Sequence, residues 1–371
     1  MHIPDGYISP ATCLATYGIS LPFWYVASRR VNRLFRIRMV PLLSVFSAFS
    51  FVIMLFNLPI PGGTTAHAVG VGIAAIVLGP SASILAVSVA LFIQAVFFGD
   101  GGVTTFGANC FNMAIVGSLV AYGAYRLIAA RAPVTSSRRV IAAAAAGYLA
   151  INASALCAAI EFGIQPLLYK DAAGAPLYCP YPLSVTIPAM MIGHMTLAGL
   201  AELVLSGGLV AYLQKANPSL LTRTAHKSLL PGESSRAPAG AGRWPGTRPL
   251  WAAMALLLIL TPLGILAAGT GWGEWAARDF SNPAVRQQMI ASSRNVAPPN
   301  FVPRGLQRLS SVWTAPFPQY APRFIRSPAF GYLLSAMVGT GASILVFLLA
   351  GLFFKAAPAS ELAPGNNAGA G

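Results

Sequence analysis

The first two residues of the chain offer three nitrogen atoms to a single metal ion. The free amine of Met1, the backbone amide of His2 and the His2 imidazole can close one five-membered and one six-membered chelate ring. The three nitrogens then lie near one plane and leave one in-plane position open. That geometry suits a square-planar ion, which among biological metals indicates Ni(II) or Cu(II).

A second histidine is a candidate for the open position. His67 follows the glycine pair Gly62-Gly63, which lets the backbone approach another segment closely. A neutral imidazole from His67 would complete a planar set of four nitrogens. We therefore expect Met1, His2 and His67 to be the metal ligands.

Polar residues cluster in one short stretch that apolar sequence flanks on both sides. Two interpretations stay open for them: they orient the imidazoles and hold the N-terminal segment, as the outer ligands of metal sites do, or they cap a tight turn. The group consists of Gln94, Asp100, Asn109 and Asn112, with Asp5 beside the N-terminus as a further member.

Other polar residues in apolar surroundings give weaker signals. His194 and Glu202 are eight residues apart in one hydrophobic stretch, where ionisable groups suggest a function by default. A hydrogen bond between helices is the interpretation that we favour for them over metal ligation. The four cysteines form no C-x-x-C pair and are expected to pack as small buried groups.

Three missing motifs exclude whole classes of protein. The chain has no G-x-x-x-x-G-K-[ST] loop for ATP, no H-E-x-x-H motif of a metalloprotease and no run of carboxylates for Mg or Ca. It also offers no nucleophile–base pair. We expect a protein that is not an enzyme and needs no cofactor, with the metal ion as its substrate.

Composition indicates what carries these residues. The chain has 371 residues, of which 56% are hydrophobic and only 9% charged, whereas soluble domains carry about 25% charged residues. Spans of about 20 apolar residues cross a bilayer. We predict an all-α polytopic membrane protein with spans near 12–28, 39–58, 66–80, 82–99, 107–130, 139–163, 183–214, 249–269 and 331–354. The third and fourth meet at Gly79-Pro80 and are either two crossings or a broken, re-entrant pair.

The net charge of +15 is explained by topology rather than by nucleic acid. Arginines and lysines gather after the first, fifth and seventh spans, and the connections 59–65 and 99–106 carry none. The positive-inside rule then places the N-terminus outside and the C-terminus inside a bacterial inner membrane. No cleavable signal peptide is evident, so we expect Met1 to be retained.

The chain divides into two membrane units. Residues 1–214 form a bundle of about seven spans, and 249–355 form a two-span hairpin around a long outer loop, 270–330. The stretch 215–248 is rich in Pro, Gly, Ser and Arg and is predicted to be a cytoplasmic linker. The tail 356–371 is predicted to be disordered.

Four motifs in order resemble one family. Residues Met1 to Pro10, Gly62 to Gly70, Phe98 to Met113, and Pro182 to Glu202 are similar to the CbiM/NikM proteins, and the match covers 1–214. These are the substrate-binding S components of energy-coupling-factor importers for cobalt and nickel. The second unit resembles their small two-span N subunit. Thr261 to Gly264 and Gly271 to Trp275 are closer to the fused nickel version than to the cobalt version.

The resemblance implies a mechanism and partners. It implies that the Met1 amine, the His2 amide and imidazole, and His67 hold the ion in a square plane, and it makes Co(II) the rival of Ni(II) in place of copper. It further implies a transmembrane coupling subunit and cytoplasmic ATPase subunits as partners, beside membrane lipids. The alternative is a metal-binding permease or sensor that works without ATP. Such a permease should carry paired acidic and histidine residues deep in its spans, and only Glu161, His194 and Glu202 qualify.

Overall fold

The computed structural model describes residues 1–34, 40–222, 248–267, 269–322 and 324–353, and most of them are helical. The first unit contains α1 (Pro10–Leu34), α2 (Val40–Ile53), α3 (Val71–Leu78), α4 (Pro80–Ile93), α5 (Phe106–Asn109), α6 (Gly117–Ala129), α7 (Ser137–Gly163), α8 (Gln165–Leu168), α9 (Leu183–Gly193), α10 (Gly199–Ala216) and α11 (Ser219–Thr222). The second contains α12 (Arg248–Leu260), α13 (Pro283–Ser292), α14 (Arg304–Leu309) and α15 (Pro328–Phe353). Short π-helical turns at Gln94–Phe98, Cys110–Val116 and His194–Ala198 extend or join the first unit's helices.

The all-α membrane architecture predicted from composition is confirmed. Within the described residues, five helical segments are long and apolar enough to cross a membrane: Pro80–Phe98, Phe106–Ala129, Ser137–Leu168, Leu183–Ala216 and Pro328–Leu352. α1 has 25 residues but is outside these five; it contains several polar residues, and its arginines lie near its C-terminal end. The apolar helices Val40–Ile53 and Trp251–Leu266 are shorter than the spans predicted there.

The predicted crossing at 66–80 is wrong, because the helix there ends at Gly79-Pro80, whereas the predicted fourth span lies in Pro80–Phe98, which is long enough to cross by itself. Residues Leu58–Ile60 (β1) and Thr64–Ala66 (β2) form a small antiparallel hairpin. α3 then has only eight residues, about 12 Å of helix, which is far short of a bilayer core. Gly79 adopts a positive φ of 78° that ends α3, and Pro80 starts α4.

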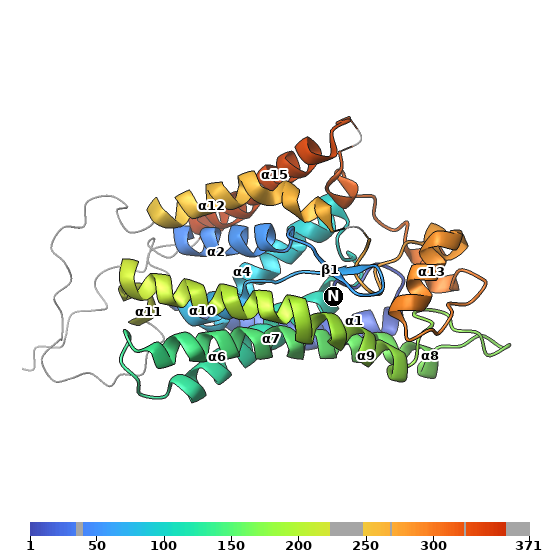
Figure 1. The fold of residues 1–371 in the computed structure, drawn as a ribbon, viewed down its shortest axis with the longest axis horizontal. Helices are drawn as coiled ribbons and strands as arrows, with labels where there is room; N and C mark the ends of the chain where they lie inside the picture. The colour runs from blue at the N-terminus through green and yellow to red at the C-terminus, as the bar shows by residue number, and fades with distance from the viewer. Residues whose placement is uncertain (35–39, 223–247, 268, 323, 354–371) are drawn as a thin grey trace, which may run out of the picture.

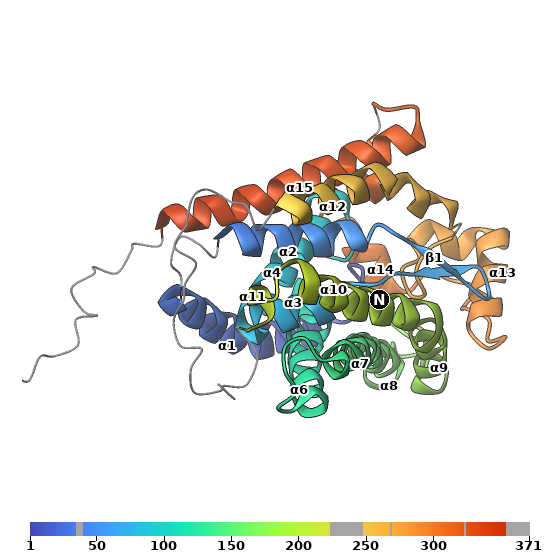
Figure 2. The same ribbon diagram turned by 60° about the vertical axis from the view of Figure 1, so that its left-hand side comes forward.

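Small residues let the central helices approach each other closely. Gly72 of α3 and Gly147 of α7 both face Ser206 of α10, and a Cβ built on Gly147 would lie 2.5 Å from the Ser206 Oγ. Such contacts between small residues are the usual basis of close helix packing in membranes. α6, α9 and α10 pack around α7, while α12 and α15 lie along α2 on the other side of the bundle (Figures 1 and 2).

The loop 270–330, which was predicted to lie outside the membrane, contains more structure than the sequence predicted. It includes α13, α14 and two 3-10 turns, Ala277–Ser281 and Pro318–Tyr320. In Figure 1 these segments cover the end of the bundle near the hairpin and α8. Within the predicted linker, residues 215–222 complete α10 and form α11, and Arg248 begins α12. The rest of that linker and the predicted tail lie outside the described residues.

Candidate metal site

The first three residues are inserted into the interior of the bundle. Met1 and His2 are only 3% and 1% exposed, and the N-terminus lies beside β1 and α10 in both ribbon views (Figures 1 and 2). The Ile3 backbone N–H donates to Asn109 Oδ1 at 2.8 Å, and Asn109 Nδ2 donates back to the Ile3 carbonyl at 3.1 Å. The Gly102 N–H also donates to that carbonyl, at 2.9 Å. The segment is therefore fixed through its backbone, next to the two residues predicted to chelate.

Asp5 fastens the other end of the same segment. Its carboxylate accepts hydrogen bonds from the Val103 N–H at 3.1 Å and the Thr104 N–H at 2.8 Å, and from the Thr104 hydroxyl. Gly102 leaves room for this contact, because a Cβ there would lie 2.2 Å from Asp5 Oδ1. Asp5 and Asn109 thus both hold the N-terminal segment in place.

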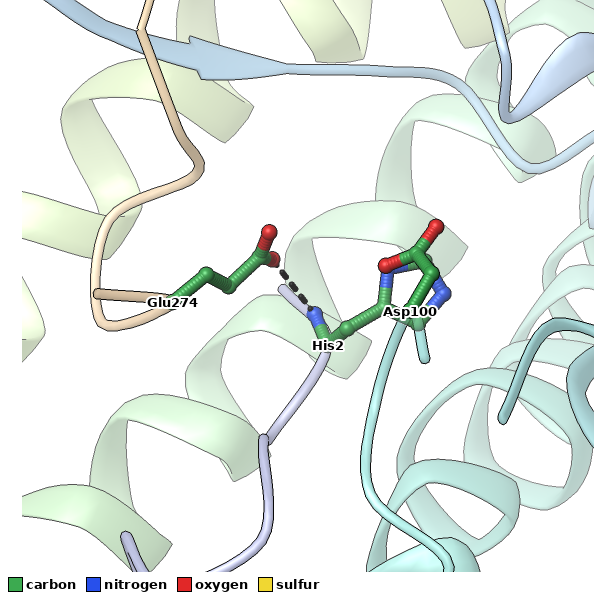
Figure 3. Close-up of side chains that lie close together, drawn as sticks. All are labelled: His2, Asp100 and Glu274. Atoms are coloured by element: carbon green, nitrogen blue, oxygen red, sulfur yellow. Dashed lines mark hydrogen bonds and ion pairs between the residues drawn. The ribbon is translucent and has the colours of Figure 1, made fainter. Parts of the chain in front are cut away.

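Two carboxylates face the three chelating nitrogens. Glu274 Oε1 accepts a hydrogen bond from the Met1 amine and one from the His2 amide, each at 3.0 Å. Asp100 Oδ1 lies 3.1 Å from His2 Nδ1, without the alignment of a hydrogen bond. One ligand atom from each of His2, Asp100 and Glu274 lies within 4.8 Å of the others. Figure 3 shows Glu274 and Asp100 on different sides of His2.

His67 lies beside His2, as a shared ion would require. The two ring centroids are 5.1 Å apart with the planes tilted by 34°. His67 Nδ1 lies 3.0 Å from the Ala68 carbonyl. In the tautomer that donates this hydrogen bond, Nε2 keeps its lone pair for a metal.

A buried carboxylate of α10 positions the segment after His67. Glu202 accepts hydrogen bonds from the backbone N–H groups of Val69 and Gly70 at 2.8 Å and of Gly72 at 3.0 Å. These three hydrogen bonds tie this segment to α10. Glu202 therefore acts on His67 through the backbone, and it takes the helix-tying role that the sequence favoured.

Burial keeps both imidazoles ready to bind a metal. Desolvation lowers the pKa of His2 to about 4, and burial together with the neighbouring His2 lowers the pKa of His67 to about 4. Burial, with the charge of Glu274, raises the pKa of Asp100 to about 6. Burial alone would raise the pKa of Glu274, yet the N-terminal ammonium and the imidazoles beside it hold that pKa below its ordinary value. At neutral pH the site thus combines neutral imidazoles with carboxylates that favour a cation.

The remaining predicted residues form their hydrogen bonds with groups outside the N-terminal segment. Gln94 Nε2 donates to the Tyr320 hydroxyl at 3.1 Å and to Asp100 Oδ2 at 3.4 Å, while the Tyr320 hydroxyl donates to the same Asp100 oxygen at 2.5 Å. Asn112 instead donates to Glu161 at 2.8 Å and does not bond the N-terminal segment. His194 Nδ1 lies 2.7 Å from the Met190 carbonyl of its own helix. All four cysteines are free thiols.

Sequence reasoning missed two residues that belong to the second unit, Glu274 and Tyr320. A signal for Glu274 was available, because the whole chain has only nine carboxylates and one of them stands within Gly271-Trp272-Gly273-Glu274-Trp275. Tyr320 gave no such signal. Its contact depends on how the loop 270–330 folds back onto the turn that contains Asp100.

Comparison with known proteins finds that this chain is similar to metal transport proteins. The chain matches the family model of CbiM, the cobalt uptake substrate-specific transmembrane region, over residues 2–220, and the PDGLE domain over residues 248–356. The fused nickel transport protein NikMN of Rhodobacter capsulatus is 53% identical over 353 residues, which cover 95% of this chain and 98% of the relative. The probable fused nickel transport protein LarMN of Lactiplantibacillus plantarum is 38% identical over 94% of this chain and 96% of its own length. A solved structure described as a truncated transition metal transporter has a TM-score of 0.54 and 50% identity, covering 57% of this chain and 98% of its own.

Proposed function

Because the chain belongs to the CbiM family of cobalt-uptake substrate-specific transmembrane proteins, here followed by a PDGLE domain, we propose that it is the metal-binding component of a nickel importer. The membership makes it a metal-transport component and a multi-pass membrane protein. The proposal that this component binds nickel rests on one observation: the Met1 amine, the His2 amide and the His2 and His67 rings lie together in one buried place.

The substrate ion would be bound by nitrogen atoms alone. The amine, the deprotonated amide and Nδ1 of His2 would occupy three corners of a square, and Nε2 of His67 the fourth. An ion held in this way must displace the protons of the amine and the amide, so binding is linked to proton release. Glu274 and Asp100 would supply negative charge around it without being needed as ligands.

Nickel is favoured over cobalt by two observations. A planar set of nitrogens that includes an amide suits Ni(II) best among the ions that the cell imports. Two relatives that match nearly the whole of this chain are described as a fused and a probable fused nickel transport protein. Cobalt stays the rival ion, since it also accepts nitrogen ligands.

ATP-driven import would need further subunits. The chain has no phosphate-binding loop of the G-x-x-x-x-G-K-[ST] type, so ATP hydrolysis would belong to cytoplasmic ATPase partners joined through a transmembrane coupling subunit. The basic residues at 126–139 would then face the cytoplasm of a bacterial inner membrane, where anionic lipid headgroups attract them, and Met1 would face the outside. Nickel uptake that continues unchanged in cells lacking the ATPase partners would contradict this part of the proposal.

Equilibrium nickel binding to the full-length protein in detergent tests the site. His2→Ala and His67→Ala each remove a ligand and should weaken nickel binding by more than roughly 100-fold, since even outer residues of metal sites cost about 10–100-fold. The control is His226→Ala, which changes a histidine in the stretch before α12 and should bind as the wild type does. The bound nickel should be diamagnetic and yellow-orange, as planar Ni(II) is.

Two results would contradict the site. Near-normal affinity in both His2→Ala and His67→Ala would remove these residues as ligands. Paramagnetic nickel would instead indicate a six-coordinate ion held by the carboxylates of Asp100 and Glu274. A tag or extra residue placed before Met1 must be avoided in these samples, because it converts the amine into an amide.

A further inference from the structure

Glu274 belongs to the second unit, yet its carboxylate contacts the first two residues of the chain. Oε1 accepts hydrogen bonds from the Met1 amine and from the His2 amide, both at 3.0 Å. These are two of the three nitrogens that the proposed chelate uses. One oxygen atom therefore marks the point toward which both N–H groups are directed, as Figure 3 shows for His2.

The backbone around Glu274 is fixed against the first unit. The Thr65 N–H of β2 donates to the Thr270 carbonyl at 3.0 Å, and Thr65 forms a bridge with Gly271. The Glu274 N–H closes a turn onto the Gly271 carbonyl at 3.0 Å. The carboxylate folds back over Gly271 so closely that a Cβ there would lie 2.5 Å from the Glu274 Cδ. The position of the carboxylate thus depends on a glycine three residues earlier.

Aromatic packing holds both flanks of this turn. Trp272 and Trp275 are 4% and 1% exposed. Trp272 packs edge-on against Phe162 of α7, with centroids 5.9 Å apart, and the Tyr7 hydroxyl donates to the Trp275 carbonyl at 2.8 Å. Glu274 is therefore presented from a rigid support and not from a freely moving loop.

This arrangement orders the N-terminus before a metal ion binds. A chain end has free rotation about its first bonds, and ordering it costs conformational entropy at the moment of binding. Glu274 turns the amine and the amide toward one point while they still carry their hydrogens. An ion that replaces these hydrogens meets two nitrogens that already converge. Glu274 and Asp100 are also the partly exposed members of the group, at 21% and 18%, so an arriving cation meets negative charge first.

We propose that Glu274 is a positioning residue that the second unit contributes to the metal site, where it pre-assembles the Met1 amine and the His2 amide for a divalent cation. This inference rests on the proposed function, because it takes these nitrogens as ligands. Once bound, the ion itself holds the nitrogens together. Glu274 therefore governs how fast nickel is loaded far more than how long it is retained.

Nickel association and dissociation rates in the full-length protein test this, with tryptophan fluorescence followed by stopped flow. Glu274→Ala should slow association by about tenfold, in keeping with the loss of two charge-assisted hydrogen bonds, and should change dissociation by less than about twofold. Glu274→Gln keeps an acceptor oxygen, so its association rate should fall less than that of Glu274→Ala. Gly271→Ala keeps the charge but displaces the carboxylate, and should resemble Glu274→Ala. Its control is Gly208→Ala in α10, where a Cβ meets nothing within 4 Å.

Three results would overturn the inference. The association rate of Glu274→Ala could equal that of the wild type, or Glu274→Gln and Glu274→Ala could slow association equally. In the third, dissociation from Glu274→Ala accelerates by the same factor by which association slows. The last would make Glu274 a ligand or a general support of the fold. His2→Ala separates this from failure of the proposed function. If His2→Ala abolishes equilibrium binding while the Glu274 variants load normally, only the role of Glu274 is wrong.

Discussion

At the scale of single residues, a large share of the chain's few carboxylates lies around the proposed site. The chain has nine carboxylates, and four of them surround the N-terminal segment and His67. Asp5 and Glu202 accept backbone N–H groups and fix the segments that carry the ligands. Asp100 and Glu274 face the chelating nitrogens. The two imidazoles stay neutral because burial lowers the pKa of each to about 4.

The number of protons released on nickel binding follows from these protonation states. Near pH 7 we expect about two protons per nickel, one from the ammonium group and one from the amide, because both imidazoles are neutral and bind through a nitrogen that carries no proton. Affinity should fall as the pH falls, since protons compete for the same nitrogens. Below about pH 4 the imidazoles also become protonated and the count should rise.

Isothermal titration calorimetry in buffers with different ionisation enthalpies gives this count. A protein carrying an extra residue before Met1 serves as the control, since its Met1 nitrogen is an amide. A count near one at pH 7 would mean that the amide does not coordinate, and a count near zero would mean that neither the amine nor the amide does. A count near four would mean that the imidazoles are protonated, against the effect of their burial.

At the scale of elements, irregular turns rather than helices hold the proposed ligands. The N-terminal segment is bound by the turn 99–105 between α4 and α5, and His67 stands between the hairpin and the short helix α3. Two π-helical turns begin at Gln94 and at His194, and a third begins directly after Asn109. Such turns are frequent at functional sites, because they redirect side chains that a regular helix would point elsewhere.

A glycine in the turn 99–105 tests whether that turn positions the N-terminus. In Gly102→Ala the new Cβ would lie 2.2 Å from Asp5 Oδ1 and 2.5 Å from the Asp5 backbone nitrogen, so the segment must shift. We expect nickel affinity to fall by roughly 10–100-fold, as for other changes behind metal ligands. The matched control is Gly123→Ala in α6, where a Cβ meets nothing within 4 Å. Equal nickel affinity in the two variants would show that the turn has no such role.

At the scale of the whole molecule, the second unit is part of the site and of the bundle. The Tyr332 hydroxyl of α15 donates to the Leu55 carbonyl at 2.9 Å. Gly339 lies so close to Phe51 that a Cβ there would be 2.0 Å from its ring. Tyr320 donates to Asp100, and Glu274 accepts from Met1 and His2. The described parts of the two units thus share one core and both contribute residues to the proposed metal site.

Thermal unfolding of the full-length protein in detergent should reflect this sharing. We expect a single transition whose midpoint rises when nickel is added, because an ion bound only by the folded state stabilises it by about 4 kcal/mol at 1,000 times its Kd. His2→Ala is the control and should show almost no shift with nickel. Two transitions, with nickel moving only one of them, would mean that the units unfold independently.

How much of this could be predicted from the sequence varies with the range of the interaction. The membrane class follows from composition, and the chelate follows from the covalent order of Met1 and His2, which brings three nitrogens within reach before any folding. The break at Gly79-Pro80 is also local, since a positive φ and a proline are backbone properties. The short length of α3 and the hairpin before it were not predicted, because apolar sequence by itself does not mark where a helix begins.

The sequence alone determined that this chain is a polytopic membrane protein whose first residues can chelate a metal, because hydropathy and chelate rings are properties of neighbouring residues. The tertiary structure decided which distant groups surround that chelate. His67 and Asp100 lie beside His2, Glu202 fixes the segment after His67, and Glu274 arrives from more than 270 residues away. Contacts of this kind are made by packing between elements, and no local pattern of residue types specifies them.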